Sequence, residues 1–314
     1  AVLRGLAGHP GYEVVAVLVN DPAKEGREVG EIVGGTPLGV VASRDVEKVL
    51  GMGADALAYF GPSAIHAEAN MANLTAALRA GLNVVDTSMG AFQNPKRVPD
   101  EMRAPIEEAC RAGGSTFFSG GIDPGFANDL FPITLVGLCA RVDSVRTTEF
   151  IDGGSYPDQA SLRMMGLLSD TTQPALLESP GMMTGIWGGP LYMIAEALGV
   201  EIEETREVYE RWPAPEARDF PLGRVEAGQC AAHRIELQGV VGGEPRIFVD
   251  HLHRMYADAA PDWPRPQMDR VHANRIEIQG SPNVVQETVM TDEHTGDGNG
   301  GGCLADPPNV GARE

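Results

Sequence analysis

The stretch ADALAYFGPSAIHAEANMANLTAALRAGLNVVDT, residues 54–87, has the pattern of a strand, a helix and a second strand. Ala54–Phe60 is an apolar run closed by a Gly-Pro pair, and Leu82–Thr87 is a second apolar run. Between them, Ala67–Ala80 carries its apolar residues at helical spacing. This order predicts two parallel strands joined by a helix.

Strand and helix patterns continue to alternate on both sides of this unit. Before it, the valine-rich run Tyr12–Asn20 predicts a strand, and Asp45–Leu50 predicts a short helix. After it, Pro99–Arg111 has the pattern of a helix and Ser115–Ser119 that of a strand. We therefore predict an α/β fold with a doubly wound parallel sheet in a first domain, residues 1–121.

A different pattern begins after Gly121. Asp123, followed by proline, has the residues of a helix start, so we expect it to cap a helix that runs to Leu138. Two more helices are expected at Leu162–Leu168 and Ile186–Leu198. Strand patterns follow at Val142–Ile151, Glu204–Trp212, Gln229–Val241, Pro245–Tyr256 and Asn274–Gly280, with a hairpin turn at Gly242-Gly243.

These elements predict a second, α+β domain over residues 122–290 with a mixed, largely antiparallel sheet. The last stretch, residues 291–314, is rich in Gly, Asp and Pro, and we expect it to be a disordered tail.

Composition narrows the classes of partner. The chain has 24 Lys and Arg against 44 Asp and Glu, a net charge of −20, which disfavours binding to nucleic acid. Its apolar runs are shorter than the ~18 residues of a membrane span. The four cysteines are far apart and form no CxxC pair, so we expect neither a disulfide framework nor a zinc site. The prediction is a cytoplasmic protein with a small-molecule partner.

The start of the chain bears on cofactor binding. A dinucleotide-binding domain opens with a strand, a glycine loop and a helix, and its second strand ends at an acidic residue. Tyr12–Asn20 followed by Asp21 suits that second strand, but only eleven residues precede it, where ~25 are needed. We therefore expect the chain to begin inside the motif; the alternative is another α/β fold that starts at Ala1. The GxGxxG at residues 296–301 is a poor loop candidate, because no apolar helix follows it.

The end of the second strand suggests how a nicotinamide cofactor is held. An acidic residue there favours the free ribose 2′-hydroxyl of NAD, whereas basic residues favour the 2′-phosphate of NADP. Both residue types are present, so both cofactors stay open. The predicted cofactor-binding residues are Asn20, Asp21, Lys24 and Arg27, together with Phe60, Gly61 and Pro62 after a later strand.

Three segments carry a family resemblance. VLVNDPAKEGREVGEIVGGTPLGVVASRDVEKVL (residues 17–50), GGIDPGFANDLFPITL (residues 120–135) and GSPNVVQETVM (residues 280–290) resemble the dihydrodipicolinate reductase-like proteins. That family includes 2,4-diaminopentanoate dehydrogenase and the native amine dehydrogenases. The resemblance implies a Rossmann-type first domain, NAD or NADP as cofactor and a homodimer. It also implies that both ends of the chain are curtailed.

The sequence departs from the family at two places. It has no adjacent His-His pair, which disfavours the lysine-pathway reductase activity. The amine dehydrogenases carry a glutamate in the loop after the strand equivalent to Leu82–Thr87, where this chain has Met89 or Gly90. The resemblance therefore supports hydride transfer to or from a small carbonyl, imine or amine, and leaves reductive amination of ketones in question. The alternative is a non-catalytic remnant or binding protein that kept the scaffold.

The predicted site residues lie at strand ends and at the junction between the domains. His251 and His253 are two apart on a predicted strand and so face the same side, but no third metal ligand is evident, and we predict no metal. For Asp123, helix capping and catalysis are competing interpretations. The predicted catalytic residues are Thr87, Asp123 and His251, and the predicted substrate residues are Ser88, Met89, Asn128, Tyr156 and His253.

Overall fold

The computed structural model describes Leu3, Leu6 and residues 9–61, 66–156, 158–268 and 272–289. The chain divides into two compact units. Of the described residues, unit 1 contains those up to Met89 and the segment Val98–Gly120, and unit 2 contains Gly90–Arg97 and those from Gly121 to residue 289. The GxGxxG at residues 296–301, which the sequence made a poor loop candidate, and the predicted tail lie outside the described residues.

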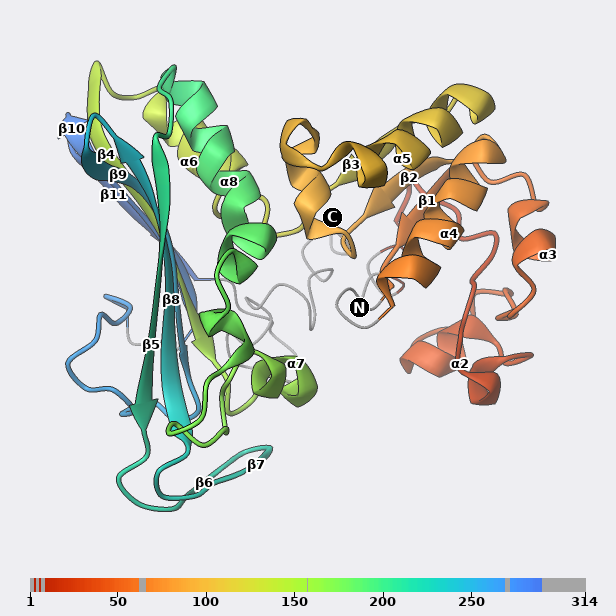
Figure 1. The fold of residues 1–314 in the computed structure, drawn as a ribbon. Helices are drawn as coiled ribbons and strands as arrows, with labels where there is room; N and C mark the ends of the chain where they lie inside the picture. Colours follow the sequence, from red (N-terminus) through yellow and green to blue (C-terminus); the bar gives the residue numbers. More distant parts are fainter. Residues whose placement is uncertain are drawn as a thin grey trace. The chain divides into compact units, whose positions relative to one another are not determined.

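Unit 1 is built on a parallel sheet of three strands in the order β1-β2-β3, drawn in orange and yellow in Figure 1. Helices connect these strands, which confirms the predicted α/β fold class. The helices also approach closely: a Cβ on Gly113 of α5 would lie 1.9 Å from the Leu78 carbonyl oxygen of α4. The elements, with η for a 3-10 helix, are η1 (Pro22–Lys24), α2 (Val29–Val33), α3 (Val46–Leu50), β1 (Ala56–Tyr59), α4 (Ala67–Arg79), β2 (Asn83–Asp86), α5 (Asp100–Gly113) and β3 (Phe117–Ser119).

The prediction of a strand at Tyr12–Asn20 is wrong in extent. The segment makes a single parallel bridge, between Leu18 and Ser43. The Val19 N–H donates to the Ser43 carbonyl oxygen at 2.9 Å, and the Ser43 N–H donates to that of Val17 at 3.0 Å. A strand is defined by a ladder that continues over several residues, and the neighbouring segment supplies one pairing residue. The prediction from valine content alone therefore made this strand too long.

Unit 2 is organised by a sheet of six strands in the order β11-β10-β4-β9-β8-β5. All neighbours are antiparallel except β4 and β9, which confirms the predicted mixed sheet. Gly242 and Gly243 have positive φ angles of 65° and 82° in the predicted β8–β9 turn. The strands are β4 (Arg141–Asp152), β5 (Glu204–Pro213), β6 (Arg218–Phe220), β7 (Gly223–Val225), β8 (Cys230–Val241), β9 (Glu244–Arg254), β10 (Ala273–Ser281) and β11 (Val284–Thr288).

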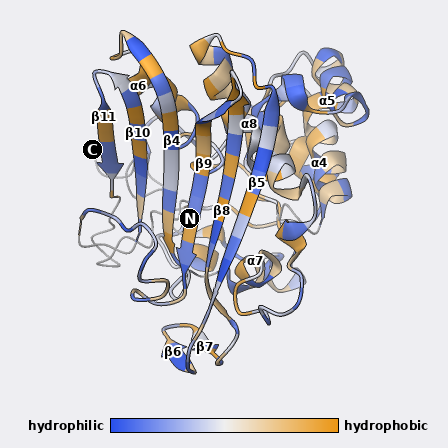
Figure 2. Ribbon diagram, turned by 60° about the vertical axis from the view of Figure 1, so that its left-hand side comes forward, coloured by the Kyte–Doolittle hydropathy of each residue, from blue (hydrophilic) through white to orange (hydrophobic). Residues whose placement is uncertain are grey.

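The core of unit 2 lies between this sheet and the apolar helix α8 (Met182–Leu198). Hydrophobic and hydrophilic residues alternate along the sheet strands in Figure 2, as expected when one face is buried. From α8, Trp187, Leu191 and Ile194 pack against Ile235 and Val249 of the sheet. The other helices of this unit are η2 (Gly90–Gln93), η3 (Pro95–Arg97), α6 (Leu130–Val136), α7 (Gln159–Met164) and η4 (Leu176–Glu178).

The prediction that Asp123 caps a helix is wrong. Helix α6 begins seven residues later, at Leu130, and its N-cap is Asp129, whose side chain accepts from the Leu130 backbone N–H. The residues between form turns, because Gly125 folds back so closely that a Cβ there would lie 2.2 Å from the Gly121 carbonyl oxygen. The Asp123 side chain therefore does not cap α6. Similarly, α7 ends at Met164, before the positive φ angles of Gly166 (108°) and Leu168 (60°), which disagrees with the predicted helix at residues 162–168.

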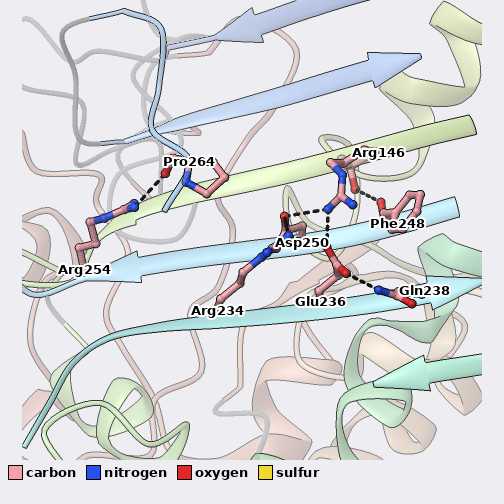
Figure 3. Close-up of polar contacts among 9 residues, drawn as sticks. Arg146, Arg234, Glu236, Gln238, Phe248, Asp250, Arg254 and Pro264 are labelled. Carbon is pink, nitrogen blue, oxygen red and sulfur yellow. Dashed lines mark hydrogen bonds and ion pairs between the residues drawn. The ribbon is translucent and has the colours of Figure 1, made fainter. Parts of the chain in front are cut away.

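The sheet face opposite α8 carries a network of charged side chains, shown in Figure 3. Asp250 of β9 accepts from Arg146 at 2.9 Å and from Arg234 at 3.0 Å. Glu236, the register partner of Asp250, also pairs with both arginines. Two guanidinium groups thus neutralise two buried carboxylates on this face. In the part of the chain that the structure describes, no helix is both long and apolar enough to cross a membrane.

Candidate active site

Asp123 and His251 form a buried acid–base pair within unit 2. The His251 Nε2 atom lies 2.8 Å from the Asp123 carboxylate, and the two side chains are 1% and 4% exposed, respectively. Since an ionised carboxylate only accepts hydrogen bonds, Nε2–H donates to it. The His251 Nδ1 atom is also buried and makes no hydrogen bond among the described residues. The pair therefore leaves one imidazole nitrogen available as a base.

Neighbouring side chains fix the His251 ring. The indole of Trp187 packs against it with 4.7 Å between ring centroids. Glu149 of β4 is the register partner of His251, is 5% exposed, and belongs to the same cluster. One oxygen or nitrogen from each of Asp123, Glu149 and His251 lies within 4.8 Å of the others. The sequence showed no third polar partner for the histidines; the structure supplies carboxylates. Asp123 and His251 are joined by a 2.8 Å hydrogen bond, so we interpret the cluster as an acid–base site.

His253 belongs to a second buried chain of polar side chains. Its Nδ1 atom lies 2.9 Å from Nε2 of His233, and the His233 Nδ1 atom lies 3.4 Å from the Tyr209 hydroxyl. The His253 Nε2 atom is 3.8 Å from the Glu149 carboxylate. Burial lowers the pKa of His253 well below its ordinary value and lowers that of His233 to about 3. Both imidazoles are therefore neutral at physiological pH.

Asn128 is held by the turn that carries Asp123. Its Oδ1 atom accepts from the Gly125 backbone N–H at 2.8 Å, and the residue is 1% exposed. Its Nδ2 group is buried without a hydrogen-bond partner in the described chain. Burial raises the pKa of the neighbouring Asp129, and the charge of Asp123 adds to this effect. The turn therefore presents the Asn128 amide as an unused hydrogen-bond donor, near the carboxyl groups of Asp123 and Asp129.

In unit 1, Asp86 organises the loop that follows β2. Its fully buried carboxylate accepts from the backbone N–H and hydroxyl of Ser88, from the Met89 N–H and from the Ser119 hydroxyl, at 2.6 to 3.1 Å. The Ser88 hydroxyl is thus committed to Asp86. Thr87 is half-buried and donates its backbone N–H to Tyr59 at 3.2 Å. Asp86 has a loop-forming role here.

The predicted cofactor residues are accessible. Asn20, Asp21, Lys24 and Arg27 are all exposed, at and after the end of the extended segment. Asp21 caps η1 by accepting from Ala23 N–H at 2.9 Å, and its other oxygen lies 4.0 Å from the Lys24 ammonium.

Phe60 and Gly61 follow β1. Phe60 is 47% exposed. Gly61 is crowded, since a Cβ would lie 2.5 Å from Asn70 Oδ1 and 2.6 Å from the Tyr59 ring. Pro62 lies outside the described residues.

The structure brings some predicted site residues together and separates others. Asp123, His251 and His253 gather with Glu149 in unit 2, whereas Tyr156 packs half-buried in a different apolar cluster with Leu162 and Met255. Sequence reasoning missed Glu149, Trp187, His233 and Tyr209. A charged residue within the predicted strand Val142–Ile151 was the available signal for Glu149; the others need the strand register.

Comparison with curated proteins identifies the family. An amine dehydrogenase from Streptomyces virginiae is 34% identical over 313 residues, which cover 99% of this chain and 87% of that protein. This chain belongs to the amine dehydrogenase family. It is an oxidoreductase, and the predicted resemblance is confirmed. A 2,4-diaminopentanoate dehydrogenase from Acetoanaerobium sticklandii is 24% identical over 208 residues, 65% of this chain and 56% of that protein. No model of a known protein family matches the chain.

Solved structures support the fold of this amine dehydrogenase family member. The amine dehydrogenase from Mycobacterium smegmatis matches with a TM-score of 0.70 and 18% identity, covering 91% of this chain and 82% of that one. Scyllo-inositol dehydrogenase from Lactobacillus casei, solved with bound NAD(H), matches with a TM-score of 0.54 and 14% identity, covering 93% and 72%. Both likenesses agree with the predicted dehydrogenase fold. Family membership also means that Met89 and Gly90 do not remove the chain from the amine dehydrogenases.

Proposed function

We propose that this protein is an NAD(P)-dependent amine dehydrogenase that interconverts a small primary amine with its imine and carbonyl forms. The observation that carries the proposal is the Asp123–His251 pair, with 2.8 Å between the carboxylate and Nε2. An amine is a cation near neutral pH and must lose a proton before its carbon can give up a hydride. Family membership supplies the reaction class, and this pair supplies the proton acceptor.

The Asp123 carboxylate orients and charges the base. By accepting from Nε2–H, Asp123 keeps His251 in the tautomer whose Nδ1 atom carries the lone pair. In amine oxidation, Nδ1 takes one proton from the ammonium group, and Asp123 stabilises the imidazolium that forms. The C–H hydrogen would then leave with its electron pair as a hydride to a bound nicotinamide, and an iminium ion would remain. Addition of water to this ion and loss of ammonia would give the carbonyl form. In the reductive direction, the same Nδ1–H returns the proton to the amine nitrogen.

Unit 1 carries the residues that fit a nicotinamide cofactor, which accepts or donates the hydride when bound. The exposed Asp21 carboxylate suits a ribose 2′-hydroxyl, and Lys24 and Arg27 suit a 2′-phosphate. Phe60 offers an exposed ring beside Gly61, where a side chain would clash. We propose Asn20 and Pro62 as further cofactor contacts.

Substrate contacts are proposed for both units. In unit 2, the unused Nδ2 donor of Asn128 suits a polar oxygen of the substrate, with His253 and Tyr156 as further contacts. In unit 1, Met89 offers an apolar side chain, while Thr87 is proposed to assist in proton transfer. Ser88 contributes through its backbone, because its hydroxyl is bound to Asp86.

A coupled assay tests the proposed function. Oxidation of NADH or NADPH is followed with small ketones, with and without ammonia, and the reverse reaction is followed with the matching amines. Ammonia-dependent oxidation of the cofactor is the expected result. Cofactor binding without turnover of any amine or ketone would favour the scaffold-retaining binding protein instead.

We also propose a homodimer and a cytoplasmic location. Helix α8 buries its apolar residues in its own core, so the sheet is the better candidate surface for a partner subunit. On its outward face, Arg146 and Arg234 stay partly exposed above the carboxylates that they neutralise (Figure 3), and we propose that this face contacts the second copy. Light scattering tests the state: the mass of a monomer at micromolar concentration would contradict a dimer.

A further inference from the structure

Beyond the substrate contact proposed for His253, the mechanism above assigns no role to the buried chain of Tyr209, His233 and His253. The Tyr209 hydroxyl donates to the Met165 carbonyl oxygen at 2.7 Å and lies 3.4 Å from His233 Nδ1. The His233 Nε2 and His253 Nδ1 atoms are 2.9 Å apart. His233 and His253 are 0% and 2% exposed. Each hydrogen bond between two neighbouring side chains of this chain contains one proton only.

The distances decide where the protons lie. Tyr209 has a single hydroxyl proton, and the 2.7 Å contact to Met165 is an ideal O–H···O hydrogen bond, whereas 3.4 Å to His233 is long. The tyrosine oxygen therefore faces His233 as an acceptor, and His233 carries its proton on Nδ1. A neutral imidazole has one donor and one acceptor nitrogen, so His233 Nε2 must accept from His253 Nδ1–H.

This proton order ends at an unprotonated nitrogen. We propose that Tyr209 sets the tautomers of both histidines, so that His253 Nε2 presents a lone pair toward Glu149 and accepts a hydrogen bond from an N–H group of the bound amine or of ammonia. The Nε2 atom is buried, 3.8 Å from the Glu149 carboxylate, and has no hydrogen-bond partner among the residues described.

The consequence is that this site favours ligands that donate hydrogen bonds over ligands that only accept them. A nitrogen ligand beside Glu149 and His253 can donate N–H groups to both. A carbonyl oxygen there would face the Glu149 carboxylate and the His253 Nε2 lone pair, and would be disfavoured. The inference rests on the proposed function for the identity of the ligand, but the order of the protons is a property of the free protein. Tyr209 acts through the histidines and is a positioning residue.

Nitrogen NMR of the full chain tests the proton order directly. Long-range ¹H–¹⁵N spectra at neutral pH distinguish the two neutral tautomers from imidazolium, and His233→Gln and His253→Gln identify the two rings. We expect both rings to carry the proton on Nδ1. A proton on Nε2 of His253, or on both of its nitrogens, would overturn the proposal, whether or not the protein turns over amines.

The variant Tyr209→Phe keeps the ring and removes the acceptor. The chain is then expected to reverse, so that His233 Nε2–H donates to His253 Nδ1 and His253 carries its proton on Nε2. The matched control is Tyr192→Phe, which loses a 3.0 Å hydrogen bond to Thr205 in the same unit. Unchanged tautomers in Tyr209→Phe would overturn the role of Tyr209.

Ligand binding provides the second readout. Isopropylammonium chloride is titrated against each variant by calorimetry. Tyr209→Phe should raise the dissociation constant of isopropylammonium by roughly two- to tenfold, the worth of one hydrogen bond, and Tyr192→Phe should leave it unchanged. Equal weakening in both variants would overturn the assigned acceptor, while an absence of turnover with normal isopropylammonium binding would count against the proposed function only.

Discussion

His251 Nε2 donates to the Asp123 carboxylate across 2.8 Å, although 128 residues separate the two in the chain. One side chain comes from β9 and the other from the turns that precede α6. Both are almost completely buried, so the interaction is weakly screened by solvent. This pair makes His251 Nδ1 the base of the proposed reaction.

Replacing Asp123 by asparagine should abolish most turnover. The amide no longer stabilises an imidazolium, and its NH2 group can favour the wrong tautomer of His251. We expect kcat/KM to fall by about 10² to 10⁴. Steady-state rates check this, with Asp170→Asn, at an exposed loop aspartate of the same unit, as control. A folded Asp123→Asn protein with nearly unchanged rates would show that the pair is structural.

Asp21 should discriminate between the two cofactors. Asp21→Ala is expected to weaken NADH binding by about five- to hundredfold, and NADPH binding less, because only NADH has the free 2′-hydroxyl. Fluorescence titration of both cofactors measures the difference. Asp45→Ala is the matched control, since Asp45 also caps a short helix, accepting from Lys48 N–H at 3.0 Å. Equal losses for NADH and NADPH would reduce Asp21 to a capping residue.

Asp86 should matter for stability more than Ser119, which contacts it. Asp86→Asn places an amide NH2 among donors that the carboxylate now satisfies, and we expect a loss of about 3 kcal/mol in the free energy of unfolding. Ser119→Ala removes a single hydroxyl and should cost about 1 kcal/mol. Urea denaturation measures both values. The reverse order would contradict the central position of Asp86 in this loop.

Acid should destabilise unit 2 through its buried histidines. Burial lowers the pKa of His233 from 6.5 to about 3, and it lowers that of His253 as well. At pH values between the lowered and the ordinary histidine pKa, the unfolded chain binds more protons than the folded one. The free energy of unfolding therefore falls as the pH drops below about 6.5.

Thermal denaturation as a function of pH checks this effect. His233→Gln removes one of the two groups, so its melting temperature should depend less steeply on pH in this range. His66→Gln, at an exposed histidine, should keep the original slope. A slope that His233→Gln leaves unchanged would mean that other groups control acid stability.

Local sequence patterns predicted the fold where one element's own residues decide its structure. The helix at Ala67–Arg79, the β8–β9 hairpin and the apolar helix α8 all follow from periodicity or from glycine pairs. The helix predicted at Asp123 failed, because a contact between Gly125 and Gly121, rather than local helix signals, determines that segment. Likewise, the strand predicted at Tyr12–Asn20 needed a partner that its own residues cannot reveal.

The sequence by itself determined the α/β class, the mixed second sheet, the family resemblance and the candidates Asp123 and His251. Tertiary structure decided that these two side chains touch, that Glu149 lies beside them, and that His253 continues into His233 and Tyr209. The reason is physical: hydrogen-bond partners on different strands are set by register and by the path of the turns between them, and register depends on contacts between residues far apart in the chain.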